Sequence, residues 1–179
     1  MRVVVSGTHG SGKSTLIGDF VGQHPTWQVL PDPYEYIDGA DEMPDATVFF
    51  QQLRITAHRQ LEPSKGSSIA ERGPVDFLAY LQALETLGRP GRADDLLERG
   101  WVIASHAMVG VDLLVLLPLT ENDKIELSED EDLELREAMN LALLELADDP
   151  GLVGEARVLE LAGNRKHRLA QLERAIDGC

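Results

Sequence analysis

A glycine-rich stretch directly behind the first apolar run constrains the fold of this chain more than any other feature. Residues 2–6 read RVVVS, and a short run of valines is typical of a buried parallel strand. Residues 7–14 then read GTHGSGKS and match the pattern G-x-x-x-x-G-K-[ST] at every defined position. The residues that follow, up to position 21, favour a helix. A strand, this loop and a helix in direct succession predict an α/β domain with a phosphate-binding loop.

The residue types of this loop fit the recognition of a phosphate chain. Glycines allow backbone N–H groups to turn inward and approach an anion closely, and the start of the next helix adds unpaired N–H donors. Lys13 is placed to reach the β- and γ-phosphates, the Ser14 hydroxyl to coordinate Mg²⁺, and Thr15 to support them. The residues expected to bind the nucleotide are Gly7, Thr8, His9, Gly10, Ser11, Gly12, Lys13, Ser14 and Thr15. The alternative, a glycine-rich turn with an incidental lysine, is disfavoured because the motif and its context are both satisfied.

The rest of the chain alternates between short apolar runs and longer segments with helical spacing. Strands are predicted at residues 27–30, 67–71, 111–117 and 157–161, and helices at residues 46–61, 76–87, 92–108, 130–147 and 166–176. A capping box is expected before the helix at 130–147, with Ser128 as N-cap and Glu131 as its partner. The apolar residues of the 92–108 helix could pack on the sheet or pair two subunits in a homodimer. The alternation predicts one α/β domain, residues 1–179, with a parallel five-stranded sheet and helices on both faces.

Composition and charge narrow the kinds of partner. The formal net charge is −15, and the 16 lysine and arginine residues are scattered rather than gathered in a patch. Such a surface repels nucleic acids and anionic membranes, so we expect neither as a partner. The single cysteine, Cys179, has no second cysteine for a disulfide, and no apolar window is long enough to span a membrane. These features, together with the lack of a signal-peptide pattern, predict a cytoplasmic protein.

Other classes of protein with this loop carry motifs that the chain lacks. A GTPase would need a guanine-reading motif such as N-K-x-D, and the sequence contains none. A motor-type ATPase would need an apolar strand that ends in Asp-Glu, but the strongest apolar strand reads VDLLVLLP and ends in Leu-Pro. The function therefore depends on residues elsewhere in the chain.

An acid and an arginine stand at the end of the third predicted strand, at the edge where ligands lie in open α/β sheets. Glu71 could order water around Mg²⁺ or hold a hydroxyl of an acceptor. Arg72 could neutralise charge on a transferring phosphoryl group. The alternative is a plain surface ion pair. The strand-end position, with a helix starting directly behind, favours the functional interpretation.

Three stretches together resemble a known group of proteins. They are GTHGSGKST at 7–15, ERGPVDFLAYL at 71–81 and VLELAGNRKHRLAQLERAI at 158–176. In this order they resemble the small P-loop kinases of the nucleoside and nucleotide kinase class, in particular AAA_28-type and ribosylnicotinamide kinase-like domains. The resemblance implies a three-layer P-loop fold with the strand order 2-3-1-4-5. It also implies transfer of the ATP γ-phosphoryl group, with Mg²⁺, to a hydroxyl of a small nucleoside-like acceptor.

The resemblance further implies an acceptor site beyond the P-loop. Asp32, in LPDPYE, matches an acid that holds the acceptor hydroxyl or acts as general base, with Glu35 as second choice. Gln51 or Gln52 matches a helix glutamine that binds the acceptor base, and Tyr34 could stack on the acceptor ring. The expected acceptor-site residues are Asp32, Tyr34, Glu35, Gln51, Gln52, Arg54, Arg59 and Glu71. Structural alternatives stay open, because Asp32 could simply shape a turn and the glutamines could face solvent.

Two more segments take their expected roles from the resemblance. In these kinases a lid follows the fourth strand, and the corresponding segment here, residues 119–136, carries eight acidic residues against Lys124. Arg136 is the candidate lid arginine, and a single arginine makes a thin clamp over the phosphates. Asn164 and Arg165 match the loop that lies under the adenine.

Three functions remain open at this point. The preferred one is a kinase in which Lys13 and Arg72 stabilise charge while Asp32 orients the hydroxyl of a small-molecule acceptor. The second is a regulatory ATPase or switch whose acidic lid meets a protein partner. The third is a nucleoside monophosphate kinase, in which Arg54, Arg59 and Arg72 would bind the acceptor phosphate.

Overall fold

The computed structural model describes residues 1–33, 45–63, 66–89, 93–119 and 132–178. Its centre is a five-stranded sheet in which all neighbouring strands run parallel, in the order β2-β3-β1-β4-β5. The strands are β1 (Arg2–Ser6), β2 (Gln28–Leu30), β3 (Ser68–Glu71), β4 (Leu113–Leu116) and β5 (Arg157–Glu160). Both the number of strands and their order agree with the sequence prediction.

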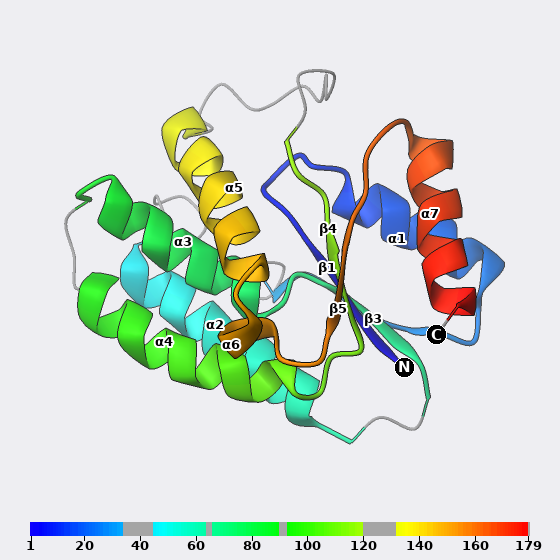
Figure 1. The fold of residues 1–179 in the computed structure, drawn as a ribbon, viewed down its shortest axis with the longest axis horizontal. Helices are drawn as coiled ribbons and strands as arrows, with labels where there is room; N and C mark the ends of the chain where they lie inside the picture. Colours follow the sequence, from blue (N-terminus) through cyan, green and yellow to red (C-terminus); the bar gives the residue numbers. More distant parts are fainter. Residues whose placement is uncertain (34–44, 64–65, 90–92, 120–131, 179) are drawn as a thin grey trace.

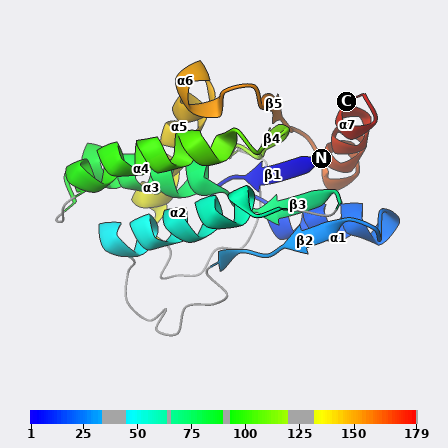
Figure 2. The ribbon, with the colours of Figure 1, turned by 90° about the horizontal axis from the view of Figure 1, so that it is seen from below.

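Helices cover both faces of the sheet and complete the three layers (Figures 1 and 2). One face is covered by α1 (Lys13–Gln23) and α7 (Arg165–Asp177). The other is covered by α2 (Ala46–Leu61), α3 (Pro74–Thr86), α4 (Ala93–Met108), α5 (Leu133–Ala147) and α6 (Pro150–Val153). Successive side chains of a strand point to opposite faces, so Val3 and Val5 join the core under α1 and α7 while Val4 joins the core under α2 to α6.

The apolar residues of α4 pack inside the molecule. Leu96, Leu97 and Trp101 lie against the core cluster shared with α2 and α3. A Cβ atom at Gly100 would lie 3.0 Å from Leu53 Cδ1 and 3.1 Å from Leu78 Cδ1, so the missing side chain permits this close approach. Packing on the rest of the protomer thus accounts for these residues, and the homodimer stays a prediction. No helix among the described residues is long and apolar enough to cross a membrane.

Helix starts differ from the sequence prediction where capping decides them. Helix α3 begins at Pro74 rather than at residue 76, because Gly73 is its N-cap and Asp76 occupies the third helical position. Helix α5 begins at Leu133, where the Asp132 carboxylate accepts a hydrogen bond from the backbone N–H of Leu135. Ser128 and Glu131, for which we predicted a capping box, lie outside the described residues, as does most of the predicted lid. The short helix α6 is absent from the prediction because four residues carry too little periodicity to reveal it.

The register of the sheet brings three loops to one edge. Val5 is paired with Glu71 across β1 and β3, and Leu30 with Ala70 across β2 and β3. The residues directly behind β1, β2 and β3 therefore emerge side by side, and we call this end of the sheet the carboxyl edge. It is the end at which ligands bind in open parallel sheets.

Candidate active site

The loop behind β1 has the backbone of an anion-binding loop. Gly7, Gly10 and Gly12 have positive φ angles of 156°, 66° and 93°, a region that favours glycine. A Cβ atom at Gly7 would lie 2.6 Å from Ser11 Oγ and 2.8 Å from the carbonyl oxygen of Leu117. The first glycine of the motif is therefore required by close packing against the residue behind β4.

Lys13, the first residue of α1, is folded back into this loop. Its ammonium donates a hydrogen bond of 2.7 Å to the carbonyl oxygen of Thr8, and the side chain is buried. Burial and, secondly, the Arg72 guanidinium lower the pKa of Lys13 from 10.5 to about 7, while the carboxylates of Asp76, Glu71 and Asp32 partly oppose this. An anion in the loop would favour the charged ammonium, so the arrangement suits a phosphate.

Ser14 and Glu71, the two residues predicted to hold Mg²⁺, are in contact. The Ser14 hydroxyl donates a hydrogen bond of 2.7 Å to Glu71 Oε1, which joins the start of α1 to the end of β3. Hydroxyl and carboxylate oxygens are the donor types that Mg²⁺ prefers, so this pair fits the ion. Among the described residues no three His, Cys, Asp or Glu side chains gather into a metal-binding group. Phosphate and water oxygens would have to supply most of the coordination.

Arg72, directly behind β3, lies at the centre of the carboxyl edge and forms hydrogen bonds to the loops behind β2 and β1. Its Nε donates to Asp32 Oδ2 at 2.7 Å, and its Nη1 donates to the carbonyl oxygen of Gly7 at 3.1 Å. Burial acts to lower the pKa of Arg72, but Tyr80, Asp32 and Asp76 outweigh it and raise the pKa, so the side chain stays cationic. Arg72 also has a φ of 66°, a strained angle for a non-glycine residue.

Asp32 and Arg59 lie beside Arg72, at the place where the acceptor site was predicted. Arg59 Nη1 donates to the carbonyl oxygen of Pro31 at 3.1 Å and so ties α2 to the loop that carries Asp32. A hollow at this place is lined by Leu30, Pro31, Thr56, Arg59, Gln60, Ala70 and Arg72. The space that it encloses is about 10 Å³, room for about one water molecule, whereas small-molecule sites usually measure roughly 300–1,000 Å³. The described residues alone therefore leave no room for a small-molecule ligand at this place.

The two candidate glutamines on α2 have opposite surroundings. Gln51 is exposed, whereas Gln52 is fully buried. Both Nε2 and Oε1 of Gln52 have no hydrogen-bond partner among the described residues. Because a buried amide without partners is costly, Gln52 is the glutamine that fits a ligand. Arg54 is exposed, so the two side chains lie on different faces of α2, and Gln52 is not among the residues that line the hollow.

Stacked rings support this region from behind. Phe49, one turn before Gln52 on α2, stacks on Tyr80 of α3 with ring centroids 4.3 Å apart. The Arg72 guanidinium lies 5.7 Å from the centroid of the Tyr80 ring. Helices α2 and α3 are therefore joined to Arg72 through aromatic contacts.

Of the remaining predicted residues, Arg136 contacts the P-loop, whereas Asn164 and Arg165 lie at the start of α7. Arg136 Nε donates to the carbonyl oxygen of His9 at 2.9 Å, so the candidate lid arginine touches the P-loop. Asn164 is the N-cap of α7 and accepts from the His167 N–H, and Arg165 forms an ion pair with Asp19 of α1. Both side chains are exposed at the start of α7, and their contact with adenine stays a prediction. Tyr34 and Glu35 lie outside the described residues.

Sequence reasoning missed two residues that hold the P-loop in place. Asp76 accepts hydrogen bonds from Ser6 Oγ, Gly7 N and Gly73 N. Burial raises the pKa of Asp76, and Arg72 and these hydrogen bonds oppose the rise. Arg168 of α7 donates to the carbonyl oxygen of Ser11 at 3.0 Å. The capping-box position of Asp76, three residues after Gly73, was a signal for the first, and nothing in the sequence marked the second.

Comparisons with known proteins agree with this architecture. The sequence matches no protein-family model, and it finds no match among curated proteins. Among solved structures, thymidylate kinase from Candida albicans is similar with a TM-score of 0.69 and 18% identity, covering 99% of this chain and 91% of its own. Deoxyadenosine kinase from M. mycoides, with its products dCMP and a flexible dCDP bound, is similar with a TM-score of 0.68 and 13% identity, covering 99% of each chain. The same enzyme with bound dATP gives a TM-score of 0.66.

These matches show that the chain has the fold of P-loop nucleoside and nucleotide kinases. At 18% identity or less they carry the fold and no further property. The narrower resemblance to AAA_28-type and ribosylnicotinamide kinase-like domains is not confirmed by them.

Proposed function

We propose that this protein transfers the γ-phosphoryl group of ATP to a hydroxyl of a small nucleoside-like acceptor. The observation that carries the proposal is the position of Arg72, which bonds to Gly7 of the P-loop and to Asp32 behind β2. One buried cation thereby joins the phosphate side of the carboxyl edge to its acceptor side. Phosphoryl transfer needs such a bridge, because its catalysis is mainly positioning and stabilisation of charge.

On the phosphate side, the loop from Gly7 to Ser14 would wrap the phosphates with its backbone N–H groups. Lys13 would exchange the carbonyl oxygen of Thr8 for a phosphate oxygen, which would favour its charged form. Arg136, already bonded to His9, would close over the loop from the start of α5. Ser14 and Glu71 would hold Mg²⁺, which supplies neutralisation of phosphate charge when bound.

On the acceptor side, Asp32 would orient the attacking hydroxyl and accept its proton. Its Oδ2 is bonded to Arg72, and its side chain keeps 15% of its surface exposed, so the carboxylate can still meet a ligand. Arg72 would stabilise charge on the group in transfer. Glu35 and Tyr34 are proposed on the same side from the resemblance alone.

The acceptor base would bind to Gln52. Its buried amide offers one donor and one acceptor side by side, and both lack partners among the described residues. A nucleobase edge with a neighbouring acceptor and donor satisfies both atoms at once. This match between two unpaired atoms and a base edge favours a nucleoside over a simple sugar or alcohol.

A monophosphate kinase is the second candidate, and one observation favours it. Arg59 and Arg72 both line the hollow at the acceptor side, where they could bind an acceptor phosphate. Both arginines also bond to backbone or carboxylate oxygens of the chain, which makes the nucleoside the preferred acceptor. A regulatory ATPase or switch is the third candidate and depends on the acidic segment that lies outside the described residues.

An isotope-transfer experiment separates these functions. The protein is incubated with Mg²⁺ and γ-labelled ATP together with a panel of nucleosides, deoxynucleosides and their monophosphates. We expect label in a nucleoside monophosphate. Label in nucleoside diphosphates alone would support the second candidate, and label in free phosphate with every acceptor would contradict a kinase. Gln52→Leu, with exposed Gln51→Leu as the matched control, then shows whether the acceptor base meets Gln52.

A further inference from the structure

Asp76, on the first turn of α3, is fully buried although it is a carboxylate. Its three hydrogen-bond donors come from separate places: the Ser6 hydroxyl at 2.5 Å, the Gly7 N–H at 3.0 Å and the Gly73 N–H at 2.8 Å. Ser6 ends β1, Gly7 opens the P-loop and Gly73 precedes α3. One carboxylate therefore joins the ends of two neighbouring strands.

A capping box alone does not account for this arrangement. A capping carboxylate needs only the N–H of its own N-cap, here Gly73, and it usually lies at the surface. The bonds to Ser6 and Gly7 reach 70 and 69 residues back in the chain. Burial of a carboxylate is costly and is sustained only when its oxygens are well satisfied, as they are here.

The backbone of Gly7 is held from both directions. Its N–H donates to Asp76 Oδ1, and its carbonyl oxygen accepts from Arg72 Nη1. Arg72 Nη1 in turn lies 4.0 Å from Asp76 Oδ1. Asp76, Gly7 and Arg72 thus form a closed set of contacts, in which moving one group moves the other two.

Arg72 and Gly73 need this support because their backbone is constrained. Arg72 has a φ of 66°, which its own side chain disfavours. A Cβ atom at Gly73 would lie 2.6 Å from Val4 Cγ1, so the chain passes close to β1 at this point. The bond from Gly73 N to Asp76 fixes the residue directly behind Arg72.

We propose that Asp76 is a positioning residue that holds the first glycine of the P-loop and the Arg72 guanidinium in the arrangement required by the phosphates of a bound nucleotide. The inference rests on the nucleotide-binding part of the proposed function. Asp76 acts through Gly7 and Arg72 and does not itself touch the ligand. Asparagine cannot fully replace it, because the Gly7 N–H donates to one carboxylate oxygen and the Gly73 N–H to the other, and the asparagine NH₂ in place of either oxygen accepts nothing.

The test compares Asp76→Asn with a matched control, Asp45→Asn. Asp45 is the N-cap of α2, where its carboxylate accepts from Val48 N at 3.0 Å, and asparagine caps equally well. Binding of a fluorescent ATP analogue with Mg²⁺ is measured directly, and transfer kinetics are measured with an acceptor from the panel above. For Asp76→Asn we expect the nucleotide Kd to rise about tenfold and kcat to fall about a hundredfold, because bonds to a charged group are lost. The KM of the acceptor should stay within about threefold, since Asp32 and Gln52 are untouched.

The kcat of a double variant distinguishes positioning through Arg72 from a general loss of stability. If Asp76 acts through Arg72, Arg72→Lys combined with Asp76→Asn should lower kcat no further than the more damaging single change. Multiplying effects would contradict the proposal, and so would an Asp76→Asn protein with the Kd and kcat of the Asp45→Asn control.

Ser6→Ala keeps the test decisive if Asp76→Asn does not fold. It removes one of the three donors and leaves the carboxylate with Gly7 and Gly73. We expect a rise of about three- to tenfold in nucleotide Kd with a folded protein, and an unchanged Kd would overturn the proposal. If the unaltered protein binds nucleotide but phosphorylates no acceptor, the kinase function fails while the Kd values still test Asp76. If it transfers phosphate and Asp76→Asn matches its control, the inference about Asp76 alone fails.

Discussion

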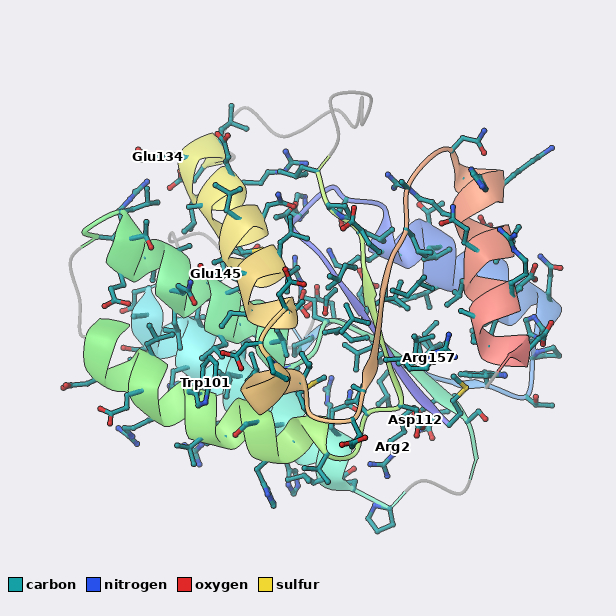
Figure 3. The ribbon with its side chains drawn as sticks, in the orientation of Figure 1. Arg2, Trp101, Asp112, Glu134, Glu145 and Arg157 are labelled. Carbon is teal, nitrogen blue, oxygen red and sulfur yellow. The ribbon has the colours of Figure 1, made fainter. Side chains whose placement is uncertain are left out.

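The two edges of the parallel sheet use charged residues in opposite ways. At the carboxyl edge Lys13, Arg72 and Asp76 are buried. We call the opposite end of the sheet, where the strands begin, the amino edge. There Arg2 and Asp112 meet near the surface, and the backbone N–H of Arg2 donates to Asp112 Oδ2 at 2.6 Å (Figure 3). The Asp112 side chain keeps 58% of its surface exposed. The sheet thus ends in solvated charges on one side and in desolvated charges on the other.

This difference is the reason to propose that an anion binds at the carboxyl edge rather than at the amino edge. The guanidinium of Arg2 donates to the carbonyl oxygens of Gln60 and Glu62, so at the amino edge it joins β1 to the end of α2. At the carboxyl edge desolvation costs free energy, and a lowered pKa of Lys13 is one sign of that cost. A bound phosphate would offset it. Changes at the carboxyl edge should therefore affect function, and matched changes at the amino edge should affect stability alone.

Lys13→Met should produce the largest loss. It keeps the aliphatic packing and removes the ammonium, so phosphoryl transfer should fall by about a hundredfold or more. The unfolding free energy measured in urea should rise, because a buried cation is lost. Lys166→Met, on the exposed start of α7, is the control and should change neither quantity. Retained transfer in Lys13→Met would remove the basis for placing the phosphates in this loop.

Arg72→Lys should rank second. A lysine cannot bond to Asp32 and Gly7 at once as the guanidinium does, so we expect kcat to fall about ten- to a hundredfold. Arg157→Lys is the matched change, since Arg157 also donates to a backbone carbonyl, that of Ala175. It should leave kcat unchanged. Equal effects of the two variants on kcat would abolish the functional distinction between Arg72 and an ordinary structural arginine.

Gln52→Leu should separate binding from stability. It removes two buried atoms without partners, so the unfolding free energy should rise by about 1–3 kcal/mol. The KM of the acceptor should rise about tenfold as its base loses two hydrogen bonds. Gln51→Leu, one residue away and exposed, should do neither. A Gln52→Leu protein that is less stable and binds the acceptor normally would assign Gln52 to the core.

A pH series should show a smaller, graded effect. If Lys13 binds phosphate as the charged ammonium, its pKa of about 7 without ligand means that affinity for MgATP should fall as pH rises above about 7. As pH rises from about 7 to 10.5, the unfolding free energy should increase, because the unfolded chain binds an extra proton in this range and the cost of burying the Lys13 ammonium declines. Titrations of a fluorescent ATP analogue from pH 6 to 9 check the first statement, and a flat affinity would refute it.

Asp112→Asn at the amino edge should have the smallest effect. The ion pair with the N-terminus spans 4.0 Å and is largely solvated, so the unfolding free energy should change by less than about 1 kcal/mol. Transfer kinetics should be unaltered. A clear loss of kcat here would show that the two edges are not functionally separate.

Much of the fold was accessible from the sequence because local patterns determine it. Buried strands read as valine and leucine runs, and the P-loop pattern placed Gly7, Lys13 and Ser14 without further information. Parallel strands deliver their carboxyl ends to one edge, which accounts for Glu71, Arg72 and Asp32 lying at the same edge, but their hydrogen bonds were seen only in the structure.

Other features required the three-dimensional structure. Gln51 and Gln52 are neighbours in the sequence, and only the rotation of α2 about its axis decides which one is buried. Arg72 has a left-handed backbone and the next residue, Gly73, packs closely against Val4, and no local sequence pattern encodes either feature. The role of Asp76 depends on donors about 70 residues away, so its sequence position reveals only a helix cap.

The most direct test of the central claim is a phosphorus NMR time course of MgATP, the protein and a mixture of deoxynucleosides. We expect the γ-phosphate signal to decline while a phosphomonoester signal of a nucleoside monophosphate grows, and Lys13→Met to abolish both changes. Growth of inorganic phosphate alone, at a rate independent of the deoxynucleosides, would contradict it.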